Sequence, residues 1–405
     1  MTVLSALMFT ARLIQSIALL VLLGGTIFLA AVRWPNSDGT RQGRWLEHRA
    51  HRYLWGAWAG ALVASLMGLA LWGPLSRNQG LDAIGSLPSL LATLHTRFGL
   101  ATLLRVALLV AVAPLLWAGW PWPGGRRRTA GHRRPGWLIA GGLLLTPPLG
   151  GHAAAGSDPV YGAIVGWIHV GAAAVWGGGL ILLLVCVLPR SRLRLRNHVP
   201  QFSAMATVSI SVATITGSVQ SWRQLHSIQA LWTTHYGRFL LAKLLCFGLL
   251  MLVAAGSHYL TKQAAEEPEQ VPALPGIGGQ RRAVAALERQ RQRQKEELRA
   301  AWLLRRFVLA EVLVAIFVLG ATELMASTQP GYVEAEQRQA RENGQLPPAN
   351  VPAAPPAADQ LLPADLGIVG DVAAQADDPD PGAGGGQAGG AVLNEQGSLQ
   401  QDPPP

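Results

Sequence analysis

Two histidines lie in a stretch of the sequence that is otherwise apolar enough to enter a membrane. Residues 151–179 read GHAAAGSDPVYGAIVGWIHVGAAAVWGGG and contain His152 and His169. An imidazole in or beside hydrocarbon needs a hydrogen-bond partner or a function, because an unpaired polar group is costly there. The segment 152–160 that joins the two predicted helices is short, so we expect the two rings to lie near each other. They are the first candidates for a metal site.

Further metal-binding side chains are predicted at the same ends of other helices: His95, His226, His235 and Met325. Imidazole and thioether groups suit copper, and the softer sulfur favours Cu(I). We therefore expect one copper site whose ligands are drawn from His152, His169, His95, His235 and Met325. In the alternative interpretation, His169 is only hydrogen-bonded to a neighbouring helix and the loop histidines have no function.

Small and aromatic residues follow His169 along the same predicted helix. Trp176 is seven residues further on and therefore lies on the same face. Its ring is a candidate wall of the pocket or a partner for a cation, or it only packs. Gly178 and Gly179 would allow another helix to approach closely, which makes a packing role the favoured one.

Four charged residues fall inside predicted membrane helices: Arg105, Lys243, Glu311 and Glu323. Charges in a membrane are costly and count as functional candidates. Lys243 and Glu323 lie near the same ends of their helices, so an ion pair between them is expected. Glu311 has no obvious partner in the sequence and is a candidate proton or cation relay.

The elements that carry these residues are long hydrophobic runs. Half of the residues are apolar and 14% are charged. We count about eight runs near the ~20 residues that span a bilayer. They are 12–32, 53–72, 98–118, 136–151, 161–188, 201–222, 238–260 and 303–327. The fourth is short and contains Pro147 and Pro148. The predicted fold class is all-α: a polytopic membrane helix bundle.

The net charge of +10 is distributed unevenly between the segments that join these helices. Alternate segments contain 24 Lys and Arg residues on one side and 7 on the other, counted outside the helices. Basic loops stay in the cytoplasm, so we expect both termini on the outer side of the membrane. The basicity thus indicates topology, and a nucleic-acid partner is not expected. Membrane lipid is.

Two four-helix units repeat in parallel orientation. SLLATLHTRFGLATLLR at 89–105 resembles SIQALWTTHYGRFLLAK at 227–243, and Arg105 corresponds to Lys243. Gln15 precedes Gly24 by nine residues, as His169 precedes Gly178. Four helices per unit place both copies in the same orientation. The predicted domains are therefore the first four-helix half, 1–151, and the second, 152–328.

Two segments outside the bundle are polar. The loop 261–302 is predicted to be cytoplasmic and to contain a solvated or membrane-surface helix. The segment 329–405 is rich in Pro, Ala, Gly, Gln and Asp. It cannot bury enough apolar surface to fold, so we expect a disordered, dispensable tail outside the membrane.

Several motifs in order resemble the copper resistance protein D family. They are GHA at 151–153, H-x6-W-x-G-G beginning at His169, FSxxA beginning at Phe202, TG at 216–217, YGR-x4-K beginning at Tyr236, and TQP at 328–330. The match covers about 150–330 well, whereas the first half shares mainly the expected helix count. The resemblance implies an inner-membrane protein of copper homeostasis, with His152 and His169 at the positions of candidate ligands.

The function implied by the resemblance is movement of copper ions inward across the bacterial inner membrane. The sequence contains no P-loop, DKTGT or CPC motif, so no nucleotide and no enzymatic activity are expected. No copper-binding β-domain is apparent, so a separate periplasmic copper-binding protein is a possible partner. Two alternatives stay open: a b-type haem protein for electron transfer, with histidines from different helices on the iron, and a non-transporting assembly or scaffold protein.

Overall fold

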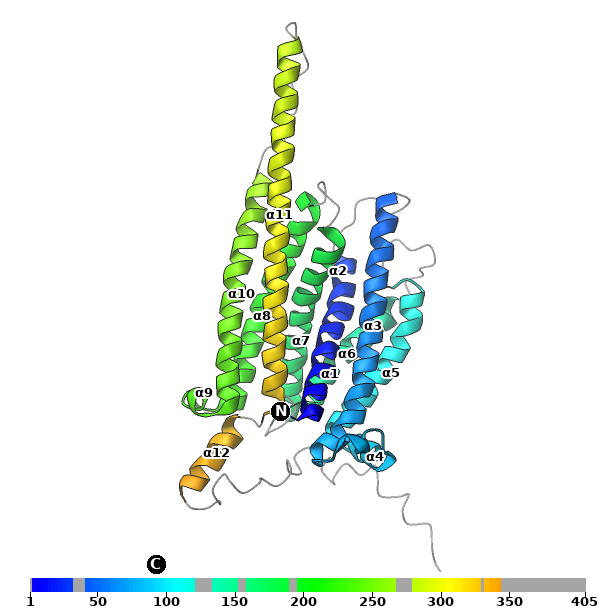
Figure 1. Ribbon diagram of the computed structural model, residues 1–405, viewed down its shortest axis with the longest axis vertical. Coiled ribbons are helices and arrows are strands. Elements are labelled where there is room, and N and C mark those ends of the chain that lie inside the picture. The colour runs from blue at the N-terminus through cyan, green and yellow to red at the C-terminus, as the bar shows by residue number, and fades with distance from the viewer. Residues whose placement is uncertain are drawn as a thin grey trace, which may run out of the picture. The chain divides into compact units, whose positions relative to one another are not determined.

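Eight long helices run side by side in the part of the chain that the computed structural model describes (Figure 1). That part comprises residues 2–31, 41–120, 133–151, 158–188, 195–266, 279–328 and 331–343. The first span joins α1 (Val3–Leu19), a π-helical turn η1 (Leu20–Gly24) and α2 (Gly25–Ala31). The others are α3 (Arg41–Ser76), α5 (Arg97–Trp117), α6 (Arg133–Leu149), α7 (Pro159–Leu182) with the π-helical turn η5 (Leu183–Val187), α8 (Leu195–Leu225), α10 (His235–Glu266) and α11 (Gly279–Ala326).

Seven of these helices are long and apolar enough to cross a membrane. The remaining long helix is α6, which has 17 residues and contains Pro147 and Pro148. It corresponds to the shortest predicted run, and it packs between α5 and α7. The predicted all-α polytopic bundle is confirmed. Seven of the eight predicted runs correspond to these seven helices, and the run predicted to be short corresponds to α6.

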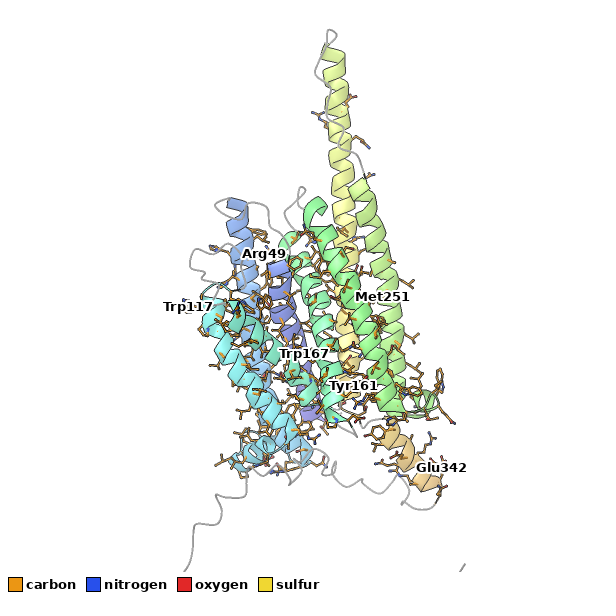
Figure 2. The ribbon with its side chains drawn as sticks, turned by 180° about the vertical axis from the view of Figure 1, so that it is seen from behind. Arg49, Trp117, Tyr161, Trp167, Met251 and Glu342 are labelled. Carbon is orange, nitrogen blue, oxygen red and sulfur yellow. The ribbon has the colours of Figure 1, made fainter. Side chains whose placement is uncertain are left out.

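Large apolar side chains point away from the bundle, as expected for a surface covered by lipid (Figure 2). Trp117 is 83% exposed, Leu245 75% and Phe317 73%. A soluble protein rarely exposes so many large apolar side chains in one contiguous surface. In a bilayer the same groups contact hydrocarbon, so their exposure costs nothing.

Short helices gather at one end of the bundle within residues 1–362, which form one compact unit. The N-terminus, α4 (Leu87–Leu94), α9 (Ala230–Thr233) and α12 (Gly331–Glu342) lie there (Figure 1). We call this the capped end, and the end from which α11 projects the basic end. The helix ends that flank the four basic segments lie at the basic end (Figure 1). The alternation of basic and non-basic segments thus corresponds to the alternation of helix direction.

The two halves of the chain meet where η1 and α7 cross. A Cβ atom on Gly24 would lie 3.0 Å from the Cα of Gly178 and would overlap the backbone carbonyl of Ala174. A Cβ on Gly178 would lie 2.8 Å from the Cα of Gly24. These glycines are the pair that the repeat predicts to be equivalent. The parallel repeat itself stays a prediction.

The third helix of each half begins with the same local structure. Thr96 caps α5 and accepts a hydrogen bond from the N–H of Gly99 at 3.0 Å. Thr234 does the same for Gly237 at the start of α10, also at 3.0 Å. In both halves a side chain on the glycine would collide with the preceding short helix or the turn after it. The matched glycines are therefore required by the close turn that precedes each helix.

The helix α11 differs from the expectation for the polar loop. It has 48 residues, so residues 279–301 continue without a break into the apolar part that begins near Trp302. The polar part projects beyond the other helices (Figure 1). The helical character predicted for the loop 261–302 is confirmed for residues 279–302, and this helix is continuous with the last membrane helix. Good helix-forming residues continue across the boundary, and no Gly or Pro interrupts them.

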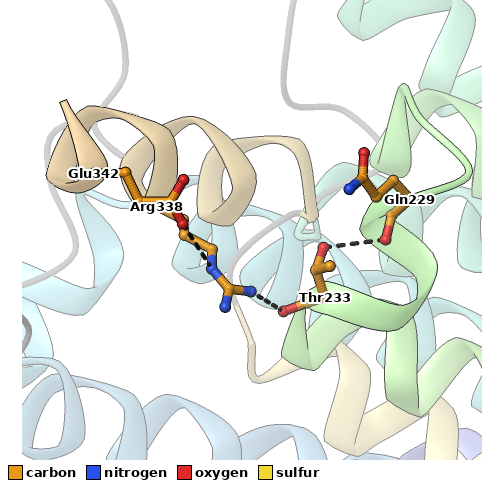
Figure 3. A network of polar contacts seen from close by, with 4 residues as sticks. All are labelled: Gln229, Thr233, Arg338 and Glu342. Atoms are coloured by element: carbon orange, nitrogen blue, oxygen red, sulfur yellow. Dashed lines mark hydrogen bonds and ion pairs between the residues drawn. The ribbon is translucent and has the colours of Figure 1, made fainter.

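The expectation of disorder from residue 329 onward was wrong for residues 331–343, which include α12. Glu334 accepts hydrogen bonds from the backbone N–H of His235 at 3.0 Å and 2.9 Å. Arg338 donates to the carbonyl of Thr233 at 3.1 Å and pairs with Glu342 at 3.5 Å (Figure 3). The prediction used the average composition of residues 329–405, which does not reveal a short helical segment at their start. The polar groups of α12 cap α9 and α10. Residues 344–405 lie outside the described residues.

We predict that the tail is dispensable only beyond α12. Truncation after Asn343 should leave the thermal unfolding midpoint unchanged, because it removes none of the described contacts. Truncation after Pro330 removes the acceptor of the His235 N–H, and loss of such a helix cap costs about 1 kcal/mol. Thermal unfolding of the two detergent-purified proteins checks this. Equal midpoints would show that α12 does not stabilise the capped end.

Candidate functional site

The imidazole of His169 lies within the bundle, between α7 and α8. Its Nδ1 atom is 3.0 Å from the backbone carbonyl oxygen of Ala213 and 3.1 Å from the hydroxyl oxygen of Thr216. The side chain is partly buried. His169 is thus hydrogen-bonded to a neighbouring helix, α8, and the atom that makes both contacts is Nδ1.

The hydrogen bonds of His169 determine its tautomer. A backbone carbonyl only accepts, so Nδ1 must carry the hydrogen. The Thr216 hydroxyl donates its own hydrogen to the carbonyl of Val212 at 2.6 Å, which leaves its lone pairs toward Nδ1. In the neutral ring the lone pair is therefore on Nε2. A histidine that donates one N–H to a carbonyl and offers the other nitrogen is the usual arrangement of a metal ligand.

Gly217 makes room for this ring. A Cβ atom at position 217 would lie 3.0 Å from Cε1 of His169 and 3.4 Å from Nδ1. Gly217 belongs to the same turn of α8 as Thr216, so one short segment supplies both the acceptor and the space. The TG motif at 216–217 is thereby explained by packing against a specific imidazole.

The first half of the chain has the same contact without an imidazole. Gln15, which the repeat aligns with His169, accepts a hydrogen bond from Ser65 of α3 at 3.4 Å. Helices one and two of the first half are thus joined by polar side chains where helices five and six are joined by His169. Only the second half therefore offers a metal-binding nitrogen at this position.

The other predicted ligands do not gather around His169 in the described part of the chain. His95 and His235 are exposed at the capped end, where His95 follows α4 and His235 begins α10. Met325 packs against the apolar cluster that contains Tyr236 and Leu240. His152 lies outside the described residues. Among those described, no group of three His, Cys, Asp or Glu side chains is arranged to hold a metal.

The residues that follow His169 have packing roles. Trp176 is partly buried against the main hydrophobic core. Gly178 packs against η1 as described above, and a Cβ on Gly179 would lie 3.2 Å or less from ring atoms of Phe202. The two glycines therefore bring α7 close to a helix of each half, as the sequence suggests.

A cluster of charged residues lies near His169 in the half of the bundle toward the capped end. Glu323 of α11 accepts a hydrogen bond from Ser16 of α1 at 2.6 Å. Lys243 interacts electrostatically with both His169 and Glu323. The ion pair expected between Lys243 and Glu323 stays a prediction.

Two arginines complete this cluster. Arg105 is 3% exposed, donates from Nε to the hydroxyl of Thr146 at 2.8 Å, and interacts electrostatically with Glu323 and Arg12. Arg12 also interacts with Glu323. Glu311 is a separate case: it is 3% exposed and lies about 18 Å from Glu323 along the same helix. Its role as a relay stays a prediction.

Sequence reasoning missed Arg12 because it began the first membrane helix at residue 12, and it missed Ser16 because a serine in a helix does not reveal its partner. In the structure the helix begins at Val3, where Thr2 caps it by accepting from the N–H of Ser5 at 3.2 Å. Arg12 is therefore two to three turns inside the helix. The threonine before an apolar run is a helix-start signal that could have revealed this.

In the part of the chain that the structure describes, these features define a polytopic α-helical membrane protein. The imidazole of His169 lies between two of its helices, and charged side chains lie in the same half of the bundle. Comparison with known proteins narrows that class. The family model described as "Copper resistance protein D-like, N-terminal domain" matches residues 3–163, and the family model described as "Copper resistance protein D" matches residues 196–325. The chain belongs to the copper resistance protein D family. The family resemblance predicted from the sequence is confirmed, and it extends to the first half, where the motifs were weaker.

A curated relative covers a smaller part of the chain. Over 123 residues the chain is 29% identical to the copper transport protein CutJ of Bacillus subtilis (strain 168). That segment is 29% of this chain and 23% of the relative, so the chain matches less than a quarter of that protein's length. No solved structure matches the chain.

Proposed function

We propose that this membrane protein moves copper ions across the bacterial inner membrane, from the outer side inward and without ATP hydrolysis. The observation that carries the proposal is the state of His169. Its Nδ1–H is bound to the carbonyl of Ala213, so Nε2 is the nitrogen left to bind a metal. Membership of a copper resistance family and the name of the relative support copper as that metal.

The copper site that we propose has few ligands. His152 is the second ligand, because it precedes α7 by a short segment and lies on the same side of the membrane in the predicted topology. Two neutral imidazoles are a ligand set that copper accepts. His95, His235 and Met325 would bind copper transiently on its way to His169. A site with few ligands binds loosely enough to release its ion, as transport requires.

Delivery and energy source follow from the same sequence features. The absence of a P-loop, DKTGT and CPC in the sequence argues against ATP-driven transport. We propose that a separate periplasmic copper-binding protein presents copper at the capped end. The electrical potential of the membrane favours inward movement of a cation, by about 2.3 kcal/mol per charge for each 100 mV.

The test is copper uptake by the purified protein in lipid vesicles. Vesicles that contain a trapped copper chelator should accumulate copper faster with the protein than without it, and an inside-negative potential should increase the rate. Copper content and an absorption spectrum of the same sample separate the candidates. A Soret band would identify a haem protein, and unaltered copper flux would leave a scaffold role.

We predict that both termini lie outside the membrane. The distribution of 24 against 7 basic residues supports this topology. Alkaline phosphatase fused after Asn343 should be active, since the enzyme folds only outside the cytoplasm, and a fusion in the segment 267–278 should be inactive. The reverse pattern would invert the topology and place the proposed copper site on the cytoplasmic side.

A further inference from the structure

The short helix α4 has its polar side chains toward the protein and its apolar side chains away from it. Ser89 and Thr93 are 3% and 1% exposed, whereas Leu87 and Leu91 are 66% and 49% exposed. A helix on a water-covered surface has the opposite arrangement, with its apolar stripe facing the core. The outer side of α4 therefore requires an apolar neighbour.

Hydroxyl groups fix the orientation of α4. Ser89 donates a hydrogen bond to Oε1 of Gln79, just after the end of α3, at 3.0 Å, and Thr93 donates to the carbonyl of Ser89 at 2.8 Å. Gly73 of α3 allows this close packing, because a Cβ there would lie 2.8 Å from the hydroxyl oxygen of Thr93. Since α4 packs on α3 through its hydroxyl-bearing side, its leucines stay on the outer side.

The exposed apolar surface extends into the turn before α4. The N–H of Ser86 donates to the carbonyl of Ala83 at 3.2 Å, which joins α4 to the 3₁₀ turn η2 (Leu81–Ala83). Residues 83–96 contain no Asp, Glu, Lys or Arg. We call the exposed apolar side chains of this segment the apolar face of α4: Leu81, Ile84, Leu87 and Leu91. This face offers a partner neither charge nor a hydrogen-bonding side chain.

Exposed aromatic side chains indicate where the bilayer surfaces lie. Trp117 of α5 and Trp302 of α11 are exposed at the basic end (Figure 2). Tyr161 of α7, Trp222 of α8 and Trp232 of α9 are exposed at the capped end. Trp and Tyr are enriched at both membrane–water interfaces, where their amphipathic rings lie at headgroup level. Because α4 precedes α5 as α9 precedes α10, α4 lies at the headgroup level of the capped end.

At this level α4 lies beside the long helices. It runs across their direction, to one side of the end of α3 (Figures 1 and 2). The lipid-covered surface of α5 begins close by, because Leu100 in the first turn of this helix is exposed, as are Leu103 and Leu104. The apolar face of α4 therefore adjoins the surface that lipid already covers.

We propose that the apolar face of α4 inserts into the boundary between headgroups and acyl chains, in the leaflet at the capped end. A helix that lies in this boundary buries its apolar side by roughly 5–10 Å. Lipid is the partner because the face is uncharged, lies at headgroup level and adjoins the lipid-covered surface of α5. The insertion holds the turn before α5 at a fixed depth. It needs no copper, so it can be tested separately from copper transport.

The experiment measures the surroundings of a fluorescent label on Leu87→Cys. The full chain labelled with nitrobenzoxadiazole is reconstituted into vesicles of phosphatidylethanolamine and phosphatidylglycerol. A nitroxide group near the top of a phospholipid acyl chain should lower the emission by about twofold or more, because the label lies in the same layer. Iodide in the water should have little effect. Ile84→Cys should give the same result, which excludes a local effect of either substitution.

Two matched positions define the extremes. Leu103→Cys, on the lipid-covered surface of α5, should be quenched by the nitroxide lipid, and Glu342→Cys, exposed at the end of α12, only by iodide. The unmodified chain, taken through the same labelling, gives the contribution of Cys186 and Cys246. Quenching of both α4 labels by iodide would overturn the proposal and leave the face open to a soluble protein. Quenching by neither reagent would overturn it too, because a second copy of the chain would then cover the face.

Discussion

Replacement of His169 by glutamine is expected to abolish copper binding and copper uptake while leaving the bundle folded. The amide of glutamine can donate a hydrogen bond to the carbonyl of Ala213, as Nδ1 does at 3.0 Å. The chain itself shows that glutamine suits such a position, because Gln15 joins the equivalent helices of the first half. An amide nitrogen has no lone pair available for copper. We expect copper affinity to fall by about 100-fold or more, since even loss of a supporting group costs 10–100-fold.

The measurement is a copper titration of purified protein together with uptake into vesicles. His48→Gln is the matched control, because His48 is exposed on α3 near the basic end. His152→Ala should also lower copper affinity. The double variant should lose less than the sum of the two single changes, because both residues act on one site. If His169→Gln binds copper like the unmodified protein, then His169 only joins α7 to α8.

The second large effect is expected where the two halves cross. Gly24→Ala would place a methyl group into the backbone of α7, at the carbonyl of Ala174. A backbone cannot turn aside as a flexible side chain does, so η1 and α7 must separate and lose contacts with each other. Overpacking of this kind costs about 3 kcal/mol. Gly178→Ala should cost a similar amount, because its Cβ would meet the backbone of η1 at Leu20 and Gly24.

Yield of folded protein and the unfolding midpoint in detergent measure this effect. Gly56→Ala is the control for helix propensity, because a Cβ at Gly56 meets no atom within 4 Å. It removes a helical glycine from α3 without a collision, and should be neutral or slightly stabilising. If Gly24→Ala is as stable as Gly56→Ala, the crossing of η1 and α7 is looser than the structure indicates.

The sequence by itself determined the features that depend on composition and spacing along one helix. Hydrophobic runs of membrane length predict the helices, and basic segments at alternate ends predict their direction. The repeat was visible because the same cap and glycine, Thr96 with Gly99 and Thr234 with Gly237, start equivalent helices. These are local signals, each satisfied within a few turns of one segment. The same kind of signal at Thr2 was overlooked, and Arg12 was therefore misplaced.

Only the tertiary structure decided which faces meet. The sequence predicts that Gly178 lies at a contact between helices, but it does not predict that Gly24 is the partner. Many other small residues in the sequence could occupy the same contact. The tautomer of His169 depends on a carbonyl 44 residues away, and backbone carbonyls carry no sequence signature. The hydrogen bond from Ser16 of α1 to Glu323 of α11 likewise joins polar groups that seem isolated when each helix is considered alone. Lateral packing is a property of all the helices together, since each contact requires the positions of several others.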